Sequence, residues 1–280
     1  MYDSHMHSRN SHDAKETVDA LCRAAIEKGL KGITITDHID MHSYVRRNAY
    51  ETIRQSIADI HEAKEKYQGQ LEVFCGVELG GFPYDREMGE KVLALTDYDM
   101  VIGTAHYISR GKFPEAYSKE KFDRESISDE EIYAFLGDYF DEMLDIVESF
   151  DFQALAHLTC PLRYINGVFH REIDIMVHED KIRLVLQRMI EKGIALEVNT
   201  SGFSEKYGYM FYPDREVLQL YKRLGGELVT LGSDAHVCKN IGMGFDAAVK
   251  LLRELGFDGY YYFKKQRAIK VPFDRGGKND

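Results

Sequence analysis

Short apolar runs and longer amphipathic segments alternate along the chain. The apolar runs are rich in β-branched residues, as in "KGITITDH" and "LEVFCGVEL", which is typical of strands buried on both faces. The amphipathic segments place apolar residues three or four positions apart, which predicts surface helices. Strands are predicted at residues 1–7, 31–38, 71–79, 99–106, 152–157, 194–201 and 226–236, with a short closing strand at 260–263. Helices are predicted at residues 17–28, 49–67, 86–95, 129–149, 179–192, 214–224 and 245–255.

This order gives seven strand–helix units in succession. Strands that alternate with helices pair in parallel through right-handed crossovers. Apolar strands in this number favour a closed or nearly closed α/β barrel, with an open doubly wound sheet as the alternative. No linker or low-complexity stretch interrupts the pattern, so a single domain over residues 1–280 is expected.

Composition narrows the class of protein. Hydrophobic residues make up 44% of the chain and charged residues 30%, as in ordinary globular proteins. No apolar run has the length of a membrane span and the polar N-terminus is not a signal peptide, so a cytoplasmic protein is expected. The net charge of −11 disfavours a nucleic-acid surface, although a small anionic substrate remains compatible with it. The cysteines have no metal-site or redox spacing: Cys22, Cys75, Cys160 and Cys238.

Histidines and carboxylates gather at the carboxyl ends of the predicted strands. His5 and His7 are two positions apart and therefore point to the same face of the first strand. In a parallel barrel all these strand ends open onto one rim, where active sites form. The residues at or just after these ends are His5, His7, His12, Asp37, His38, Glu78, His106, His157, Asp234 and His236.

Imidazoles and carboxylates without thiolates suit Zn²⁺, Mn²⁺ or Fe²⁺. A mononuclear site takes three or four protein ligands, so this set is large enough for two or three cations with a bridging carboxylate. Cations a few ångströms apart hold a hydroxide at neutral pH and neutralise charge on a phosphoryl group. The pattern therefore predicts metal-dependent hydrolysis of a phosphate ester.

The motifs "HMHS", "TDH", "GVE" and "GSDAH", with isolated histidines at 106 and 157, resemble those of the PHP (polymerase and histidinol phosphatase) superfamily. With "EVNTSG" before the last motif, the order is most similar to the histidinol-phosphate phosphatase branch. The resemblance runs from residue 3 to about residue 240. It implies a distorted (β/α)₇ TIM-like barrel with three divalent cations.

The resemblance also implies a ligand set. One cation would be held by His5, His7, Glu78 and Asp234. A second would share Glu78 and take His106 and His157, and a third would use His12, His38 and His236. Asp37 would orient an imidazole ring. Thr159 stands where the family pattern often has a carboxylate.

The expected reaction is hydrolysis of L-histidinol phosphate to L-histidinol and inorganic phosphate, a step of histidine biosynthesis. A bridging hydroxide would attack phosphorus, and Asp234 could carry its proton to the leaving alcohol. His42 is a second candidate for this proton transfer and could also touch the substrate. Arg163 is the first candidate for phosphate binding because a guanidinium can fork two phosphate oxygens, and Lys206 is the second. Arg46 and Arg47 are further candidates.

The segment 107–128 is long for a loop and is expected to cover the active site. Its Tyr107, Phe113 and Tyr117 could flank an imidazole ring. The substrate ammonium requires an acidic partner, which the sequence does not identify.

Three alternatives remain open. A PHP phosphoesterase could act on nucleotides or another small ester, although a nucleic-acid diesterase would want a basic groove. An amidohydrolase-like barrel has similar strand-end ligands but often a carboxylated lysine, and no lysine lies at a predicted strand end. A barrel that binds metal without catalysis is the third.

Overall fold

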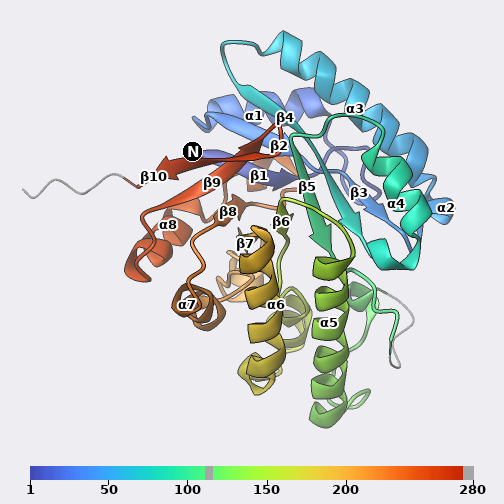
Figure 1. Ribbon diagram of the computed structural model, residues 1–280, viewed down its shortest axis with the longest axis vertical. Helices are drawn as coiled ribbons and strands as arrows, with labels where there is room; N and C mark the ends of the chain where they lie inside the picture. The colour runs from blue at the N-terminus through green and yellow to red at the C-terminus, as the bar shows by residue number, and fades with distance from the viewer. Residues whose placement is uncertain (111–115, 274–280) are drawn as a thin grey trace, which may run out of the picture.

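The strands form the centre of the molecule and the helices lie around them (Figure 1). The computed structural model describes residues 1–110 and 116–273. Within these residues the strands are β1 (Tyr2–Met6), β2 (Gly32–Ile35), β3 (His38–Asp40), β4 (Glu72–Gly80), β5 (Met100–Thr104), β6 (Ala154–Leu155), β7 (Ala195–Asn199), β8 (Val229–Gly232), β9 (Gly259–Lys264) and β10 (Arg267–Pro272). The helices are α1 (Val18–Glu27), α2 (Tyr44–Arg47), α3 (Ala49–Lys66), α4 (Arg86–Leu93), α5 (Asp129–Ser149), α6 (Glu179–Lys192), α7 (Arg215–Arg223) and α8 (Phe245–Glu254).

The strands pair in the order β1-β2-β4-β5-β6-β7-β8-β9-β10, and β3 pairs with β4 beyond the end of β2. All neighbours are parallel except β9 and β10, which form an antiparallel hairpin. The sheet curves so that β1 returns to the segment after β8. There the His7 N–H donates to the Ala235 carbonyl and the Asp234 N–H to the His5 carbonyl, at 2.9 and 2.8 Å. This is the α/β, TIM-like barrel that the sequence predicts.

Both faces of the sheet are buried, as the apolar strands predict. On β5, Val101 belongs to the large core beneath the helices, whereas Met100 and Ile102 join a small separate core with Ala154 and Phe263. Alternate residues of one strand thus serve two cores, because successive side chains point to opposite faces.

The predicted helices agree with the observed ones to within two residues at each end. Among the described α-helices and β-strands, α2, β3 and β10 were not predicted as separate elements. The short α2 and the terminal strand β10 carry many charged residues, which mask their pattern. The second predicted strand is broken, so that β2 ends at Ile35 and β3 begins at His38. None of the helices in the described part of the chain has the length and apolar character needed to cross a bilayer.

The break between β2 and β3 matters for the site. After it, β3 continues along β4 with His38 opposite Glu78 and Asp40 opposite Gly80. The parallel register thereby sets an imidazole beside a buried carboxylate at the carboxyl end of the sheet.

Candidate metal centre

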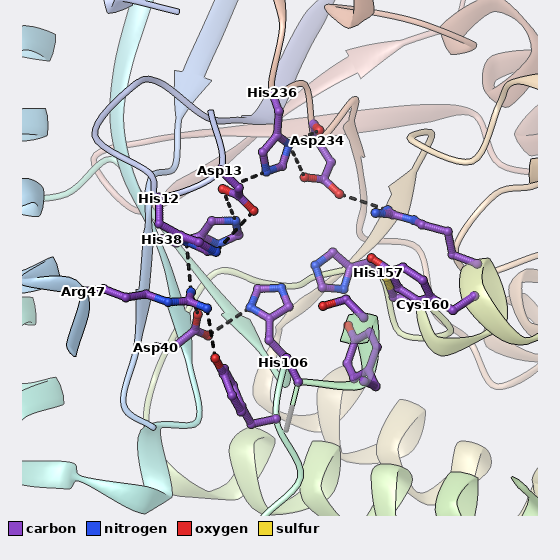
Figure 2. Close-up of a pocket in the computed structure, with 16 residues that line it drawn as sticks. His12, Asp13, His38, Asp40, Arg47, His106, His157, Cys160, Asp234 and His236 are labelled. Atoms are coloured by element: carbon purple, nitrogen blue, oxygen red, sulfur yellow. Dashed lines mark hydrogen bonds and ion pairs between the residues drawn. The ribbon is translucent and has the colours of Figure 1, made fainter. Parts of the chain in front are cut away.

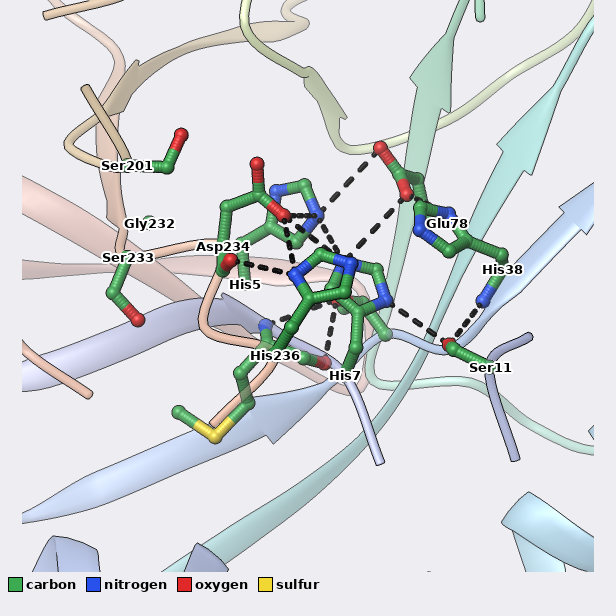
Figure 3. Close-up of polar contacts among 12 residues, drawn as sticks. His5, His7, Ser11, His38, Glu78, Ser201, Gly232, Ser233, Asp234 and His236 are labelled. Atoms are coloured by element: carbon green, nitrogen blue, oxygen red, sulfur yellow. Dashed lines mark hydrogen bonds and ion pairs between the residues drawn. The ribbon is translucent and has the colours of Figure 1, made fainter. Parts of the chain in front are cut away.

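Glu78, on β4, contacts a buried cluster of imidazoles, and dashed lines in Figure 3 join it to some of them. Its side chain is fully buried. Its Oε1 is 3.0 Å from His157 Nε2 and 3.5 Å from His106 Nε2. Its Oε2 is 2.5 Å from His38 Nδ1 and 3.8 Å from His7 Nε2. Its Oε1 also lies 3.6 Å from His5 Nε2. One carboxylate therefore contacts five rings that come from four different strand ends.

The hydrogen-bond partners of His5 and His7 fix which ring nitrogen carries the proton. His5 Nδ1 lies 2.6 Å from Glu197 Oε1, so it donates to this carboxylate. His7 Nδ1 lies 3.1 Å from Ser11 Oγ, whose own hydroxyl proton points to Asp37 Oδ1 at 2.8 Å. His7 Nδ1 is therefore also a donor. In the neutral rings both Nε2 atoms are left with a lone pair.

These two lone pairs face each other across 3.0 Å. Asp234 Oδ1 is 3.2 Å from His7 Nε2 and 3.8 Å from His5 Nε2. In the neutral state these acceptors converge without a donor among them and need a cation to hold them together. Burial lowers the pKa of His5, but Glu197, Glu78 and Asp234 raise it well above its ordinary value, so a proton on His5 can take this place when metal is absent. Two imidazoles with two carboxylates are a donor set that Zn²⁺ and similar divalent ions accept, so the residues present fit a metal site.

Two further carboxylates orient this cluster. Asp40 Oδ1 lies 3.0 Å from His106 Nδ1, which leaves His106 Nε2 toward Glu78. Glu197 Oε2 accepts from the backbone N–H of His157 at 2.8 Å. His157 and Asp234 have φ angles of +28° and +51°, which lie in or near the left-handed region. Such backbone costs about 1–3 kcal/mol and concentrates at functional sites.

A third carboxylate, that of Asp13, lies among the outer imidazoles. Its Oδ1 is 3.4 Å from His236 Nε2 and 3.6 Å from His38 Nε2, and its Oδ2 is 3.5 Å from His12 Nε2. Asp13 therefore touches every imidazole that the family resemblance assigns to the third cation.

The described residues contain four groups of three side chains that could hold a metal ion. Within each group, the three ligand atoms lie within 4.8 Å of one another. The groups are His5–His7–Asp234, His7–His38–His236, His38–Asp40–His106 and Glu78–His106–His157. These groups contain every metal-ligand candidate except His12. The ring of His12 lies 5.5 Å from that of His38, and its Nδ1 is occupied by Arg47.

The carboxylates and imidazoles of the cluster stabilise each other's charged forms. Burial raises the pKa of Glu78, but the neighbouring His38, His106 and His5 outweigh it and hold that pKa well below its ordinary value. Burial lowers the pKa of His38, and the Glu78 carboxylate raises it to about 9. Burial likewise lowers the pKa of His236, whose hydrogen bond to Asp13 raises it to about 9. Without metal, protons hold the cluster together.

A cavity opens beside the cluster (Figure 2). Arg163, the first residue of a π-helical turn at Arg163–Val168, lines it and is largely buried. Its Nη2 donates to Asp234 Oδ2 at 3.1 Å and to Ser201 Oγ. A buried guanidinium next to several cation ligands is well placed to bind an anion.

Other predicted substrate residues lie elsewhere. His42 stacks on Tyr84 and Tyr107 and lines a separate depression, together with Arg46. Lys206 is exposed and bonds to Tyr207 Oη at 2.9 Å. Neither His42 nor Lys206 is among the residues that line the cavity, so the geometry does not support their predicted roles.

Asp37, which is expected to orient an imidazole, acts on one only through a serine hydroxyl. Its carboxylate accepts hydrogen bonds from the hydroxyls of Ser8, Ser11 and Ser56, at 2.6, 2.8 and 2.5 Å. Asp37 reaches His7 only through Ser11. Direct imidazole partners are instead Glu197 and Asp40.

The segment 107–128 contributes to the cavity wall. Tyr107 and Tyr117 both line the cavity and are buried. Tyr117 packs edge-on against Tyr139 and Tyr164. Phe113 lies outside the described residues.

Sequence reasoning missed Asp13, Asp40 and Glu197. Each had a signal in the chain. Glu197 is a charged residue within the apolar run "IALEVN", and Asp40 follows His38 by two positions, on the same face of β3. Asp13 directly follows His12.

Known proteins share this architecture. A probable histidinol-phosphatase of Deinococcus radiodurans is 28% identical over 257 residues, which cover 91% of this chain and 93% of that protein. A histidinol-phosphatase of Lactococcus lactis is 26% identical over 96% of this chain and 98% of its own length. The crystal structure of histidinol phosphate phosphatase from Lactococcus lactis, complexed with zinc, L-histidinol and phosphate, superposes with a TM-score of 0.75 at 22% identity. It covers 96% of this chain and 98% of its own chain, which shows a common fold.

The PHP domain matches residues 3–201, which is more than half of the chain. This match contains the cluster residues that lie on or just after β1, β3, β4 and β5, and both His157 and Glu197. Asp234 and His236, which follow β8, complete the cluster outside it. On its fold and on this match, the chain belongs to the PHP domain family.

Proposed function

We propose that this protein is a metal-dependent phosphomonoesterase that hydrolyses L-histidinol phosphate to L-histidinol and inorganic phosphate. The observation that carries the proposal is the buried ring of imidazoles and carboxylates around Glu78, with the Arg163 guanidinium beside it. Such a site joins cation ligands to an anion-binding group, which is what transfer of a phosphoryl group to water requires.

We assign the ligands as the family resemblance implies, for three divalent cations of zinc, manganese or iron. His5, His7, Glu78 and Asp234 would hold the first. Glu78 would be shared with the second, which takes His106 and His157, and His12, His38 and His236 would hold the third. When bound, these cations lower the pKa of a nearby water and neutralise phosphoryl oxygens.

Arg163 binds the phosphoryl group in this proposal. Its guanidinium already bonds to Asp234 and Ser201, so its planar fork is held in place before substrate enters. Asp234 Oδ2 faces Arg163 while Oδ1 faces the cluster, and this carboxylate is the candidate carrier of the proton to the leaving alcohol. His42 is the less suitable of the two candidates because it lines the separate depression.

The relatives support L-histidinol as the leaving alcohol. Proteins named histidinol-phosphatase match this chain over nearly its whole length and nearly theirs. The Lactococcus lactis structure, which shares this fold, contains L-histidinol and phosphate. A step of histidine biosynthesis in the cytoplasm follows from this assignment. Among the residues that the structure describes, no lysine lines the cavity, which disfavours a site built on a carboxylated lysine.

A phosphate-release assay tests the proposal. The zinc- or manganese-loaded protein should release phosphate from L-histidinol phosphate with a kcat/KM far above that for nucleoside 3′- or 5′-monophosphates, and a chelator should abolish release until metal is restored. Faster hydrolysis of a nucleotide would overturn the substrate assignment. Turnover that persists after complete metal removal would overturn the mechanism.

A further inference from the structure

Arg47, the last residue of α2, lies at the edge of the candidate metal centre (Figure 2). Its Nη1 is 3.0 Å from His12 Nδ1 and 3.5 Å from Asp40 Oδ2. Its Nη2 donates to Tyr107 Oη at 3.0 Å. The side chain is 17% exposed and lines the same cavity as Arg163.

The contact with His12 fixes the state of that ring. A guanidinium has only donors, so His12 Nδ1 must accept with its lone pair. A neutral imidazole has one N–H, which is then on Nε2, 3.5 Å from Asp13 Oδ2. The ring thus has one free lone pair, and Arg47 uses it.

A cation bound to His12 cannot coexist with this contact. If the cation takes Nε2, the ring proton must move to Nδ1, where an N–H would then face the N–H of Arg47. If the cation takes Nδ1, Arg47 loses its acceptor. With either nitrogen as ligand, the Arg47–His12 hydrogen bond breaks.

We propose that Arg47 is a second phosphate-binding residue, which uptake of a cation by His12 releases into the cavity. The proposal rests on the phosphomonoesterase assignment above. Arg47 and Asp234, the partner of Arg163, lie on different sides of the cavity in Figure 2. Two guanidinium groups from different sides can each fork oxygens of one phosphate.

This arrangement couples metal to substrate. Without a cation on His12, Arg47 stays bonded to His12 and is not free to bind phosphate. Because coupling is reciprocal, bound phosphate should in turn favour occupation of the His12 cation site.

The test measures zinc and inorganic phosphate separately on the intact protein. Bound zinc is counted by elemental analysis across a series of buffered free zinc concentrations, and phosphate binding is measured by equilibrium dialysis of the zinc-loaded protein. The variants are Arg47→Ala and Arg47→Lys, the second of which keeps the charge and loses the fork. Arg54→Ala is the matched control, since Arg54 is an exposed arginine on α3 that pairs with Glu51.

Arg47→Ala should weaken phosphate binding by about ten- to a hundredfold, the effect of losing charge-assisted hydrogen bonds. The same variant should take up its last zinc at roughly threefold or more lower free zinc, because His12 no longer has a bond to break. Arg47→Lys should show a smaller loss of phosphate affinity, and Arg54→Ala should match the wild type in both measurements.

Weaker zinc binding by Arg47→Ala than by the wild type would overturn the proposal. If Arg47 only supported His12 structurally, its loss would weaken zinc binding. Wild-type phosphate affinity in Arg47→Ala, or an equal loss in Arg54→Ala, would also overturn it. A wild-type protein that binds zinc and phosphate as described but leaves L-histidinol phosphate intact would contradict only the proposed function.

Discussion

Glu197 orients two members of the candidate metal centre at once. One oxygen accepts from His5 Nδ1 and the other from the backbone N–H of His157, and the side chain is 1% exposed. In Glu197→Gln one of these donors would face an amide N–H. We expect zinc affinity to fall about 10- to 100-fold, as for other residues that orient metal ligands. Competition with a chromophoric chelator measures this.

Glu191→Gln is the control, because Glu191 is exposed on α6 and pairs with Arg188. Equal zinc affinity in Glu197→Gln and the control would show that Glu197 does not set the orientation of His5.

For individual residues, the sequence predicted which side chains gather at the candidate metal centre, but it did not predict every hydrogen-bond partner of these side chains. Side-chain parity placed His5 and His7 on one face, and the strand ends placed Glu78 among the imidazoles. Asp37 bonds to the hydroxyls of Ser8, Ser11 and Ser56 and reaches His7 only through Ser11, a relay that the linear pattern does not show. Pairings between distant strands, such as Glu197 with His5, depend on rotamers that a linear pattern does not carry.

At the scale of the elements, a buried arginine, Arg171, holds the part of the chain just before α5. The guanidinium of Arg171, 3% exposed, donates to the carbonyls of Phe122 and Ile127 at 2.8 and 3.0 Å and also binds Asp129. Tyr117 of the cavity wall belongs to the same segment. We expect Arg171→Ala to lower the free energy of unfolding by about 1–3 kcal/mol and to speed amide exchange in residues 116–128.

Hydrogen-exchange mass spectrometry and thermal unfolding measure the two effects. Arg183→Ala, on the exposed face of α6, should change neither. Wild-type exchange in Arg171→Ala would mean that other contacts hold the segment.

Helices were predicted far more accurately than strands. The seven predicted helices have apolar periodicity, and α1, α4, α5 and α7 also begin at a side-chain cap, such as the Ser128 and Glu131 capping box of α5. The strand ends depend on pairing across the sheet, so the break that creates β3 could not be foreseen. It is this break that sets His38 opposite Glu78.

The whole molecule has a net charge of −11, whereas its cavity is lined by two arginines and several imidazoles. His38 and His236 have raised pKa values of about 9, so they are protonated at pH 7 without metal. A metal ligand must be neutral, so zinc uptake should displace protons. Apparent zinc affinity should therefore rise as pH increases from 7 toward 9.

Zinc titration in weak buffer with a pH indicator measures the protons released. Zinc binding that releases no protons and does not change with pH would show that these rings are already neutral.

The central claim is that Glu78 is shared by two cations, and zinc content tests it most directly. We predict more than one zinc per wild-type chain, and a clear loss of zinc in Glu78→Gln but not in Glu87→Gln, whose side chain is 83% exposed on α4. Wild-type zinc content in Glu78→Gln would contradict the claim.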